Sequence, residues 1–170
     1  MDIQVFANNI MILEGQRIRC ALGGGGIRRV KREGDGATPA GCFPLRRVLY
    51  RADRIAPPAT RLPLAALAED DGWCDAAADP NYNRQIKRPY PARHEVLWRD
   101  DPLYDLIVVI GHNDDPPTPG AGSAVFLHCA RQNFAATEGC VALRQDDLRR
   151  LLARCGPGDR LCVSCDDAPP

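Results

Sequence analysis

A histidine and a cysteine twelve residues apart are the side chains of this sequence best suited to catalysis. His128 ends an apolar stretch at 124–127, and Cys140 follows a short polar loop and a glycine. A cysteine attacks a carbonyl carbon as the thiolate, and a nearby imidazole can take the thiol proton and lower its pKa. We therefore interpret Cys140 as a nucleophile and His128 as its base, and expect the pKa of Cys140 to lie below that of a free cysteine. The alternative is an ordinary buried thiol.

Two local features position this pair. Residues 123–128 alternate, which predicts a strand with Ala124, Phe126 and His128 on one face. Gly139 has no Cβ, so the backbone beside Cys140 can come close to a substrate. Amide N–H groups around Gly139 and Cys140 can then face a developing oxyanion.

The other predicted elements are mostly short strands. Apolar or alternating runs predict strands at 3–6, 11–13, 17–21, 43–50, 104–110 and 161–163. A helix capped by Gln145 or Asp146 has a leucine stripe at 148, 151 and 152, and Gly156-Pro157 ends it. Residues 53–100 are rich in proline and charge and are expected to form a long loop region with a short apolar piece at 62–67. We predict a mainly β sandwich or barrel-like fold with one or two short helices, formed as a single domain by residues 1–170.

Composition excludes several classes of partner. The 22 basic and 22 acidic residues balance, so nothing indicates nucleic-acid binding. No apolar run approaches the length of a membrane span. The first nine residues lack the basic and long apolar regions of a secretory signal peptide.

Eight cysteines raise the question of disulfides or metal. They are scattered singly, and a chain of 170 residues can build a core without covalent links, so a disulfide scaffold is not expected. Cys162 and Cys165 have metal-ligand spacing, and Cys155 could add a third ligand, but structural zinc needs four. We expect most of these side chains to be small buried hydrophobes, and we predict no metal site.

Other polar groups have a functional and a structural interpretation. His112 follows a predicted strand and is a candidate pocket residue, whereas His94 lies in the polar loop region and is expected at the surface. The glycines at 23–26 read as a flexible turn, because no phosphate-binding motif follows them. The basic cluster at 28–32 reads as a solvated surface that could lie near an acidic substrate. The aromatic residues of 53–100 either cover the edge of the core or line a groove for substrate; they are Trp73, Tyr82, Tyr90 and Trp98.

Three segments together resemble one enzyme family. Thr137-Glu138-Gly139-Cys140 resembles the Ser/Thr-x-Gly-Cys motif of the YkuD-type L,D-transpeptidases, which pair it with an upstream histidine. Residues 36–45, Gly-Ala-Thr-Pro-Ala-Gly-Cys-Phe-Pro-Leu, resemble the Thr-Pro-x-Gly-x-Phe segment of these domains. Residues 158–163 are similar to the closing strand of their fold. The resemblance covers about residues 20–165 and is closest to the small stand-alone branch of alpha- and betaproteobacteria.

The resemblance assigns further roles. The third member of the catalytic group is a main-chain carbonyl just after the histidine, here that of Cys129, which would fix the imidazole tautomer. Thr137 belongs to the motif and is a candidate substrate contact. Many relatives carry Arg or Asn two residues after the cysteine, where this sequence has Ala142, and histidine where it has Glu138. Arg131 or Arg144 could compensate by binding the substrate.

The resemblance implies a peptidoglycan L,D-transpeptidase that links stem peptides through a thioester on Cys140. It implies no metal or organic cofactor, inhibition by carbapenem-type β-lactams, and a periplasmic location, although no leader is recognisable. The donor bond follows either meso-diaminopimelate, giving a 3,3 cross-link, or L-Ala, giving the 1,3 cross-link associated with the small branch, which we favour slightly. An L,D-carboxypeptidase or endopeptidase of the same fold is the main alternative. A non-catalytic wall-binding module is not expected, because binding alone needs no His128/Cys140 pair.

Overall fold

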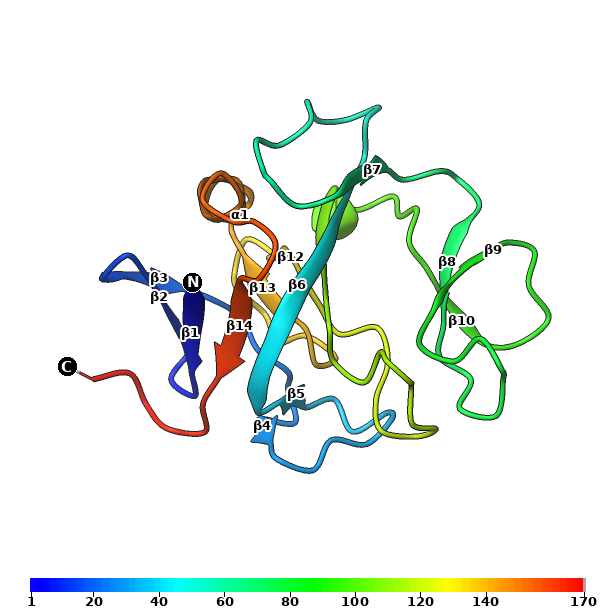
Figure 1. The fold of residues 1–170 in the computed structure, drawn as a ribbon, viewed down its shortest axis with the longest axis horizontal. Coiled ribbons are helices and arrows are strands. Elements are labelled where there is room, and N and C mark those ends of the chain that lie inside the picture. Colours follow the sequence, from blue (N-terminus) through cyan, green and yellow to red (C-terminus); the bar gives the residue numbers. More distant parts are fainter. Residues whose placement is uncertain (170) are drawn as a thin grey trace.

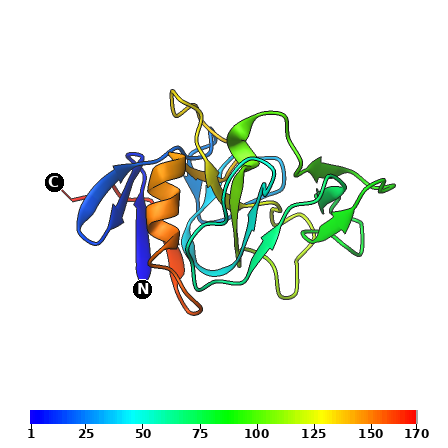
Figure 2. The ribbon, with the colours of Figure 1, turned by 90° about the horizontal axis from the view of Figure 1, so that it is seen from above.

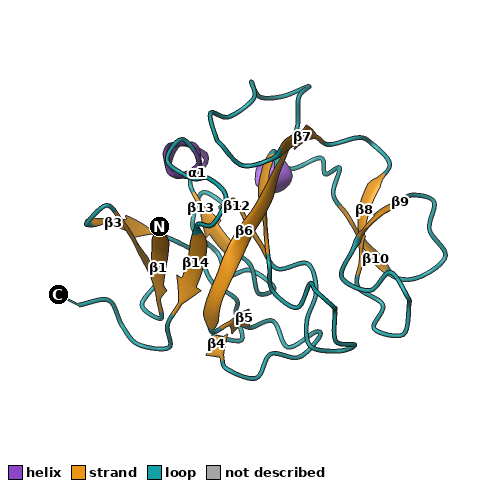
Figure 3. Cartoon of the chain, in the orientation of Figure 1, coloured by secondary structure: helices purple, strands orange, loops and turns teal. Residues whose placement is uncertain are grey.

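The fold is built mainly of strands joined by long loops (Figure 3). The computed structural model describes residues 1–169. In this range one α-helix, α1 (Gln145–Leu152), and one 3-10 helix, η1 (Pro102–Tyr104), accompany the strands. The strands are β1 (Asp2–Phe6), β2 (Ile10–Leu13), β3 (Gln16–Arg19), β4 (Ile27–Arg28), β5 (Thr38–Pro39), β6 (Gly41–Tyr50), β7 (Leu64–Ala66), β8 (Asp71–Cys74), β9 (Gln85–Lys87), β10 (His94–Val96), β11 (Leu106–Ile110), β12 (Phe126–Cys129), β13 (Val141–Leu143) and β14 (Arg160–Val163).

One large sheet forms the body of the molecule. Its strand order is β13-β12-β11-β6-β14-β1-β2-β3, with β7 paired to the long strand β6, which crosses the middle of Figure 1. An antiparallel bridge between Ala21 and Ala142 brings the chain after β3 to the far edge strand β13, so the sheet nearly closes into a barrel. This agrees with the predicted mainly β, barrel-like fold.

The leucine stripe of α1 fills the core inside this sheet. Leu148, Leu151 and Leu152 are fully buried, as predicted, and α1 packs against β12. The N-cap lies one or two residues before the predicted cap positions. Arg144 is the N-cap residue and makes no side-chain cap hydrogen bond, so the capping prediction for Gln145 or Asp146 is wrong. Packing of the leucines stabilises a helix whose capping is weak.

A second, three-stranded sheet occupies part of the predicted loop region. Its order is β10-β8-β9, and it lies at the end of the molecule away from β1–β3 (Figure 2). The strands have three or four residues, too short for a clear alternation in the sequence. Trp73 of β8 packs edge-on against Phe126 of β12, with ring centroids 4.9 Å apart, so it covers the edge of the core. This sheet therefore forms a wall beside β12.

A disulfide joins two neighbouring strands of the large sheet. Cys42 of β6 lies directly opposite Cys162 of β14, and the two are bonded across 120 residues of sequence. The expectation of no structural disulfide is thus wrong at this pair. The bond also removes Cys162 from the alternative zinc set, and Cys155 lies in the core. No cluster of three or more metal-binding side chains occurs among residues 1–169. Within the same range, no helix is long and apolar enough to cross a membrane.

Removal of this disulfide should lower stability. Cross-linking such distant residues restricts the unfolded chain, which typically contributes about 2–4 kcal/mol. We expect Cys42→Ser/Cys162→Ser to lower the free energy of unfolding in urea by that amount under non-reducing conditions. Cys165→Ser, which changes an exposed free cysteine, is the control. Equal unfolding midpoints for all three proteins would contradict the prediction.

Candidate active site

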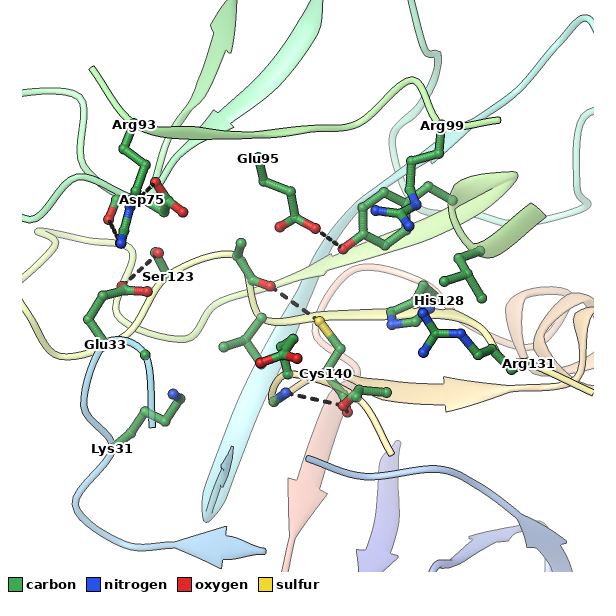
Figure 4. Close-up of a pocket in the computed structure, with 18 residues that line it drawn as sticks. Lys31, Glu33, Asp75, Arg93, Glu95, Arg99, Ser123, His128, Arg131 and Cys140 are labelled. Atoms are coloured by element: carbon green, nitrogen blue, oxygen red, sulfur yellow. Dashed lines mark hydrogen bonds and ion pairs between the residues drawn. The ribbon is translucent and has the colours of Figure 1, made fainter. Parts of the chain in front are cut away.

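The predicted base and nucleophile lie in one cavity. His128 is on β12, and Cys140 directly precedes β13, which pairs in parallel with β12 so that Leu127 lies opposite Val141. The side chains of both residues line a cavity of about 400 Å³, drawn in Figure 4. The predicted strand at 123–128 begins later, at Phe126, because Ala124 adopts a left-handed conformation with φ of +50°.

The imidazole of His128 is held in one tautomer. Its Nδ1 lies 2.8 Å from the main-chain oxygen of Cys129, and this oxygen can only accept, so Nδ1 carries the proton. Nε2 is therefore left free to act as a base on the cavity side. The ring also packs edge-on against Tyr104, with centroids 5.2 Å apart. The Cys129 carbonyl thus lies where the family resemblance implies a group that orients the imidazole.

The resting pair is uncharged. Burial raises the pKa of the Cys140 thiol to about 12, and burial lowers the pKa of the His128 imidazole to about 4. The Cys140 thiol donates to the main-chain oxygen of Ala124 at 3.2 Å, and the amide of Phe126 donates to the sulfur at 3.3 Å. The expectation that His128 lowers the pKa of Cys140 is therefore wrong for the resting protein, because desolvation outweighs the neighbouring imidazole. A thiol in this state can attack a carbonyl carbon only if a base, for which Nε2 of His128 is the candidate, takes its proton in the same step.

Alkylation of the resting protein tests whether the pKa of the Cys140 thiol is raised and not lowered. We expect the rate of Cys140 modification by iodoacetamide, located by peptide mass, to rise with pH beyond the pKa of about 8.5 of a free cysteine. An inflection well below that value would show that a stable thiolate–imidazolium pair exists. Exposed Cys165, labelled in the same experiment, gives the internal reference.

A tight turn presents Cys140 to the cavity. Gly139 has a φ of +135°, and a Cβ at this position would lie 2.7 Å from the main-chain oxygen of Ala37. The Thr137 hydroxyl donates to the main-chain oxygen of Cys140 at 2.6 Å and accepts from the amide of Gly139 at 3.1 Å. Within residues 1–169 no hydrogen bond uses the amide N–H of Cys140, so this donor remains for an oxyanion. The Gly139 N–H, by contrast, is already bonded to Thr137.

The glycines at 23–26 pack against the segment that forms this turn. A Cβ on Gly23 would lie 2.3 Å from the main-chain oxygen of Gly36, and the Gly23 amide donates to Thr38 Oγ1 at 2.8 Å. The amide of Gly24 donates to the main-chain oxygen of Thr137 at 2.9 Å. The segment is therefore tightly packed, not the flexible turn expected from sequence, and it joins the upstream Thr-Pro segment to the cysteine motif.

Replacing Gly139 by alanine should disable the turn. Backbone strain at this φ costs about 1–3 kcal/mol, and the contact with Ala37 must push the turn away from its position. A displacement of about 1 Å at a nucleophile can lower the rate about 100-fold. Thioester formation, measured by intact-protein mass, should fall accordingly. Gly158→Ala is the matched control, because Gly158 has a φ of +91° with nothing within 4 Å. Equal rates for the two variants would contradict this account of Gly139.

The structure separates the predicted substrate contacts. Arg131 and Thr137 line the cavity. Arg144 does not line it, and its guanidinium lies over the Phe134 ring, 5.6 Å from the centroid. His112 also lies outside, with Nε2 3.2 Å from the main-chain oxygen of Ala121, and it lines a neighbouring groove.

Several cavity residues escaped the sequence analysis. Arg99 lies near His128 and the predicted contact Arg131 (Figure 4). Glu95 lies between these arginines and a second charged group that contains Glu33 and Arg93. These side chains come from loops and from short strands that no local pattern marks as functional. Within the basic cluster at 28–32, predicted to be a solvated surface, the Lys31 side chain is buried, paired with Asp35 and part of the cavity wall.

Two hydrogen-bond networks fix two sides of this cavity. The Tyr82 hydroxyl donates to Glu33 Oε2 at 2.5 Å, and the Ser123 hydroxyl donates to the same oxygen at 2.7 Å. Asn83 Oδ1 accepts from the amide of Ala124 at 3.1 Å and from Trp73 Nε1 at 2.9 Å. The second network holds Ala124 where its carbonyl oxygen meets the Cys140 thiol.

Comparison with known proteins decides the family. The YkuD family, the L,D-transpeptidase catalytic domain, matches residues 3–163. The chain belongs to this family. No curated protein matches the chain.

Solved structures resemble this L,D-transpeptidase domain only distantly. An L,D-transpeptidase from Mycobacterium smegmatis is 12% identical with a TM-score of 0.44, and the alignment covers 96% of this chain and 58% of that one. The helical cell shape determining protein Pgp2 from Campylobacter jejuni is 12% identical with a TM-score of 0.41, over 98% of this chain and 48% of that one. The chain thus spans about half the length of these proteins.

Ala142 stands where many relatives carry a polar residue. It is 1% exposed, and its amide and carbonyl both bond to Ala21 across the bridge that closes the sheet. It does not line the cavity of this L,D-transpeptidase domain. The side chain at position 142 therefore contributes no polar group to the cavity.

Proposed function

We propose that this domain is a cysteine acyltransferase that cross-links peptidoglycan stem peptides. The observation that carries the proposal is the shared cavity of Cys140 and His128, with the imidazole oriented by the Cys129 carbonyl. The family supports an L,D-transpeptidase reaction, and the site supplies a nucleophile, a base and a free amide donor.

The first half-reaction transfers the donor to the sulfur. The Cys140 thiol proton passes to Nε2 of His128 while Sγ bonds to the carbonyl carbon of an L-centre. The oxyanion accepts from the amide N–H of Cys140. The imidazolium then protonates the leaving amine, and a thioester remains. An acceptor amine attacks the thioester in the second half-reaction, and the proton that it loses on attack passes through His128 to the sulfur.

For the donor we favour the bond after L-Ala, giving a 1,3 cross-link. This preference rests on the resemblance to the small branch and on Ala142, which replaces the usual polar residue after the cysteine. The leaving residue carries a free α-carboxylate in either donor, D-Glu or D-Ala, and Arg99 and Arg131 near His128 can pair with it in both. Cleavage after meso-diaminopimelate, giving a 3,3 cross-link, uses the same catalytic pair and remains the second candidate. Arg144 and His112, outside the cavity, are weaker candidates for reading the substrate.

Hydrolysis of the same thioester is the alternative activity. An L,D-carboxypeptidase or endopeptidase would pass the donor to water instead of an amine, so only the products distinguish the reactions. We further propose a periplasmic site of action and acylation of Cys140 by carbapenems, both on family grounds. The reaction as written balances without a metal or organic cofactor.

Muropeptide analysis tests the proposed function. The protein is incubated with purified sacculi, which are then digested, and the products are identified by chromatography and mass spectrometry. We expect new dimers, with a 1,3 linkage more abundant than a 3,3 linkage. Shortened monomers without dimers would identify a hydrolase, and an unchanged profile would contradict catalysis on this substrate.

A further inference from the structure

The second half-reaction releases one proton more than the Cys140/His128 pair can accept. An alkylamine resembling the lysine side chain, with a pKa of about 10.4, arrives as an ammonium ion at neutral pH. The balanced step is acyl–S–Cys140 plus R–NH3⁺ giving acyl–NH–R, the Cys140 thiol and one H⁺. Neutral His128 carries one proton from the attacking amine to the sulfur. The ammonium must lose another proton before it can attack, and that proton needs a second acceptor.

Glu95 occupies the position for this acceptor. It lies on β10 in the wall of the cavity, and Figure 4 shows its side chain directed toward the part of the cavity that holds Cys140. The Tyr104 hydroxyl donates to Oε1. In the described part of the chain, Oε2 has no hydrogen-bond partner, so one carboxylate oxygen is available to a ligand.

We propose that Glu95 is a catalytic residue of the second half-reaction: it binds the acceptor ammonium and accepts its extra proton. The inference rests on the proposed transpeptidase function and extends it to the acceptor. An anionic group beside the thioester favours a cationic amine over water, so Glu95 also shifts the outcome from hydrolysis to cross-linking.

The surroundings of Glu95 suit a base. Burial raises the pKa of its carboxyl group, the Tyr104 hydroxyl and Arg99 lower it, and the carboxylates of Asp75 and Glu138 raise it again, with a net increase. A carboxylate with a raised pKa is a better proton acceptor near neutral pH. Tyr104 connects the two halves of the site, because its hydroxyl contacts Glu95 and its ring packs nearly at right angles to the ring of His128.

The test compares Glu95→Gln with wild type in three reactions at pH 7. Glutamine keeps an oxygen for the Tyr104 hydroxyl but cannot take a proton. With a stem peptide as acceptor, we expect cross-linking to fall about 100-fold. Thioester formation, followed by intact-protein mass, should stay at the wild-type rate. Transfer to hydroxylamine, which is uncharged at neutral pH, should also be retained.

A pH series and a matched variant complete the design. The cross-linking defect should narrow as the pH approaches the pKa of the acceptor amine, because the acceptor then arrives deprotonated. Glu69→Gln, which changes an exposed glutamate outside the cavity, should behave as wild type throughout.

The other outcomes overturn the inference in distinguishable ways. Normal cross-linking by Glu95→Gln would remove Glu95 from the reaction. An equal loss of thioester formation, cross-linking and hydroxylamine transfer would show that Glu95 only maintains the structure. Wild-type protein that forms the thioester but releases only hydrolysed donor would overturn the proposed transpeptidase function, and this inference with it.

Discussion

Cys140→Ala is expected to abolish cross-linking and thioester formation while the fold remains intact. Alanine cannot attack a carbonyl, and loss of the nucleophile in comparable enzymes lowers the rate by about 10⁴-fold or more. The thiol makes two hydrogen bonds, to Ala124 and Phe126, so a modest loss of stability should accompany the change. Products from purified stem peptides, measured by mass spectrometry, give the activity, and thermal unfolding gives the stability.

Cys129→Ala is the control for this prediction. Cys129 is a buried thiol next to His128 whose side chain does not line the cavity. Its replacement leaves the main-chain oxygen that orients the imidazole. We expect this variant to keep most of its activity. An active Cys140→Ala together with an inactive Cys129→Ala would show that the nucleophile is wrongly assigned.

His128→Gln is expected to lower the rate of thioester formation by about 10²–10⁴-fold, the usual contribution of a positioned base. The effect should be large because the Cys140 thiol, with its pKa raised to about 12, provides almost no thiolate without a base. Raising the pH should partly restore the reaction in this variant, since hydroxide then removes the thiol proton. The measurement is the acylation rate by intact-protein mass as a function of pH.

His94→Gln is the matched control, because His94 lies on β10 outside the cavity and its Nδ1 is 2.7 Å from the Ala92 main-chain oxygen. It should acylate at the wild-type rate. A His128→Gln variant that acylates as fast as His94→Gln would mean that another group accepts the thiol proton.

Elements with a strong local pattern could be predicted from the sequence. These elements bury one face or the whole of a regular helix or strand, so their apolar residues follow its period. They are β11 with its apolar run, α1 with its leucine stripe, and the alternating strands β1 and β14. The tight turn at Gly139 could also be predicted, because a glycine directly before the candidate nucleophile indicates a position where a Cβ does not fit.

Features that depend on distant pairing were missed. The Cys42–Cys162 disulfide follows from the register of β6 against β14, which no local pattern contains. The β8–β10 sheet has strands too short to show a period, so Glu95 came from what looked like a loop. The direction of the pKa shift of Cys140 depends on burial, and burial depends on the whole fold.

The mass of the acyl-enzyme tests the central claim most directly. Wild-type protein is mixed with a purified stem-peptide donor in the absence of acceptor, quenched in acid, and digested for peptide mapping. The account predicts an acid-stable adduct on the Cys140 peptide, whose mass identifies the donor fragment retained and therefore the bond cleaved. A parallel reaction that also contains the acceptor shows whether the protein is active. If that reaction gives cross-linked products, the absence of any adduct, or an adduct on another residue, would contradict the role of Cys140 as the acylated nucleophile.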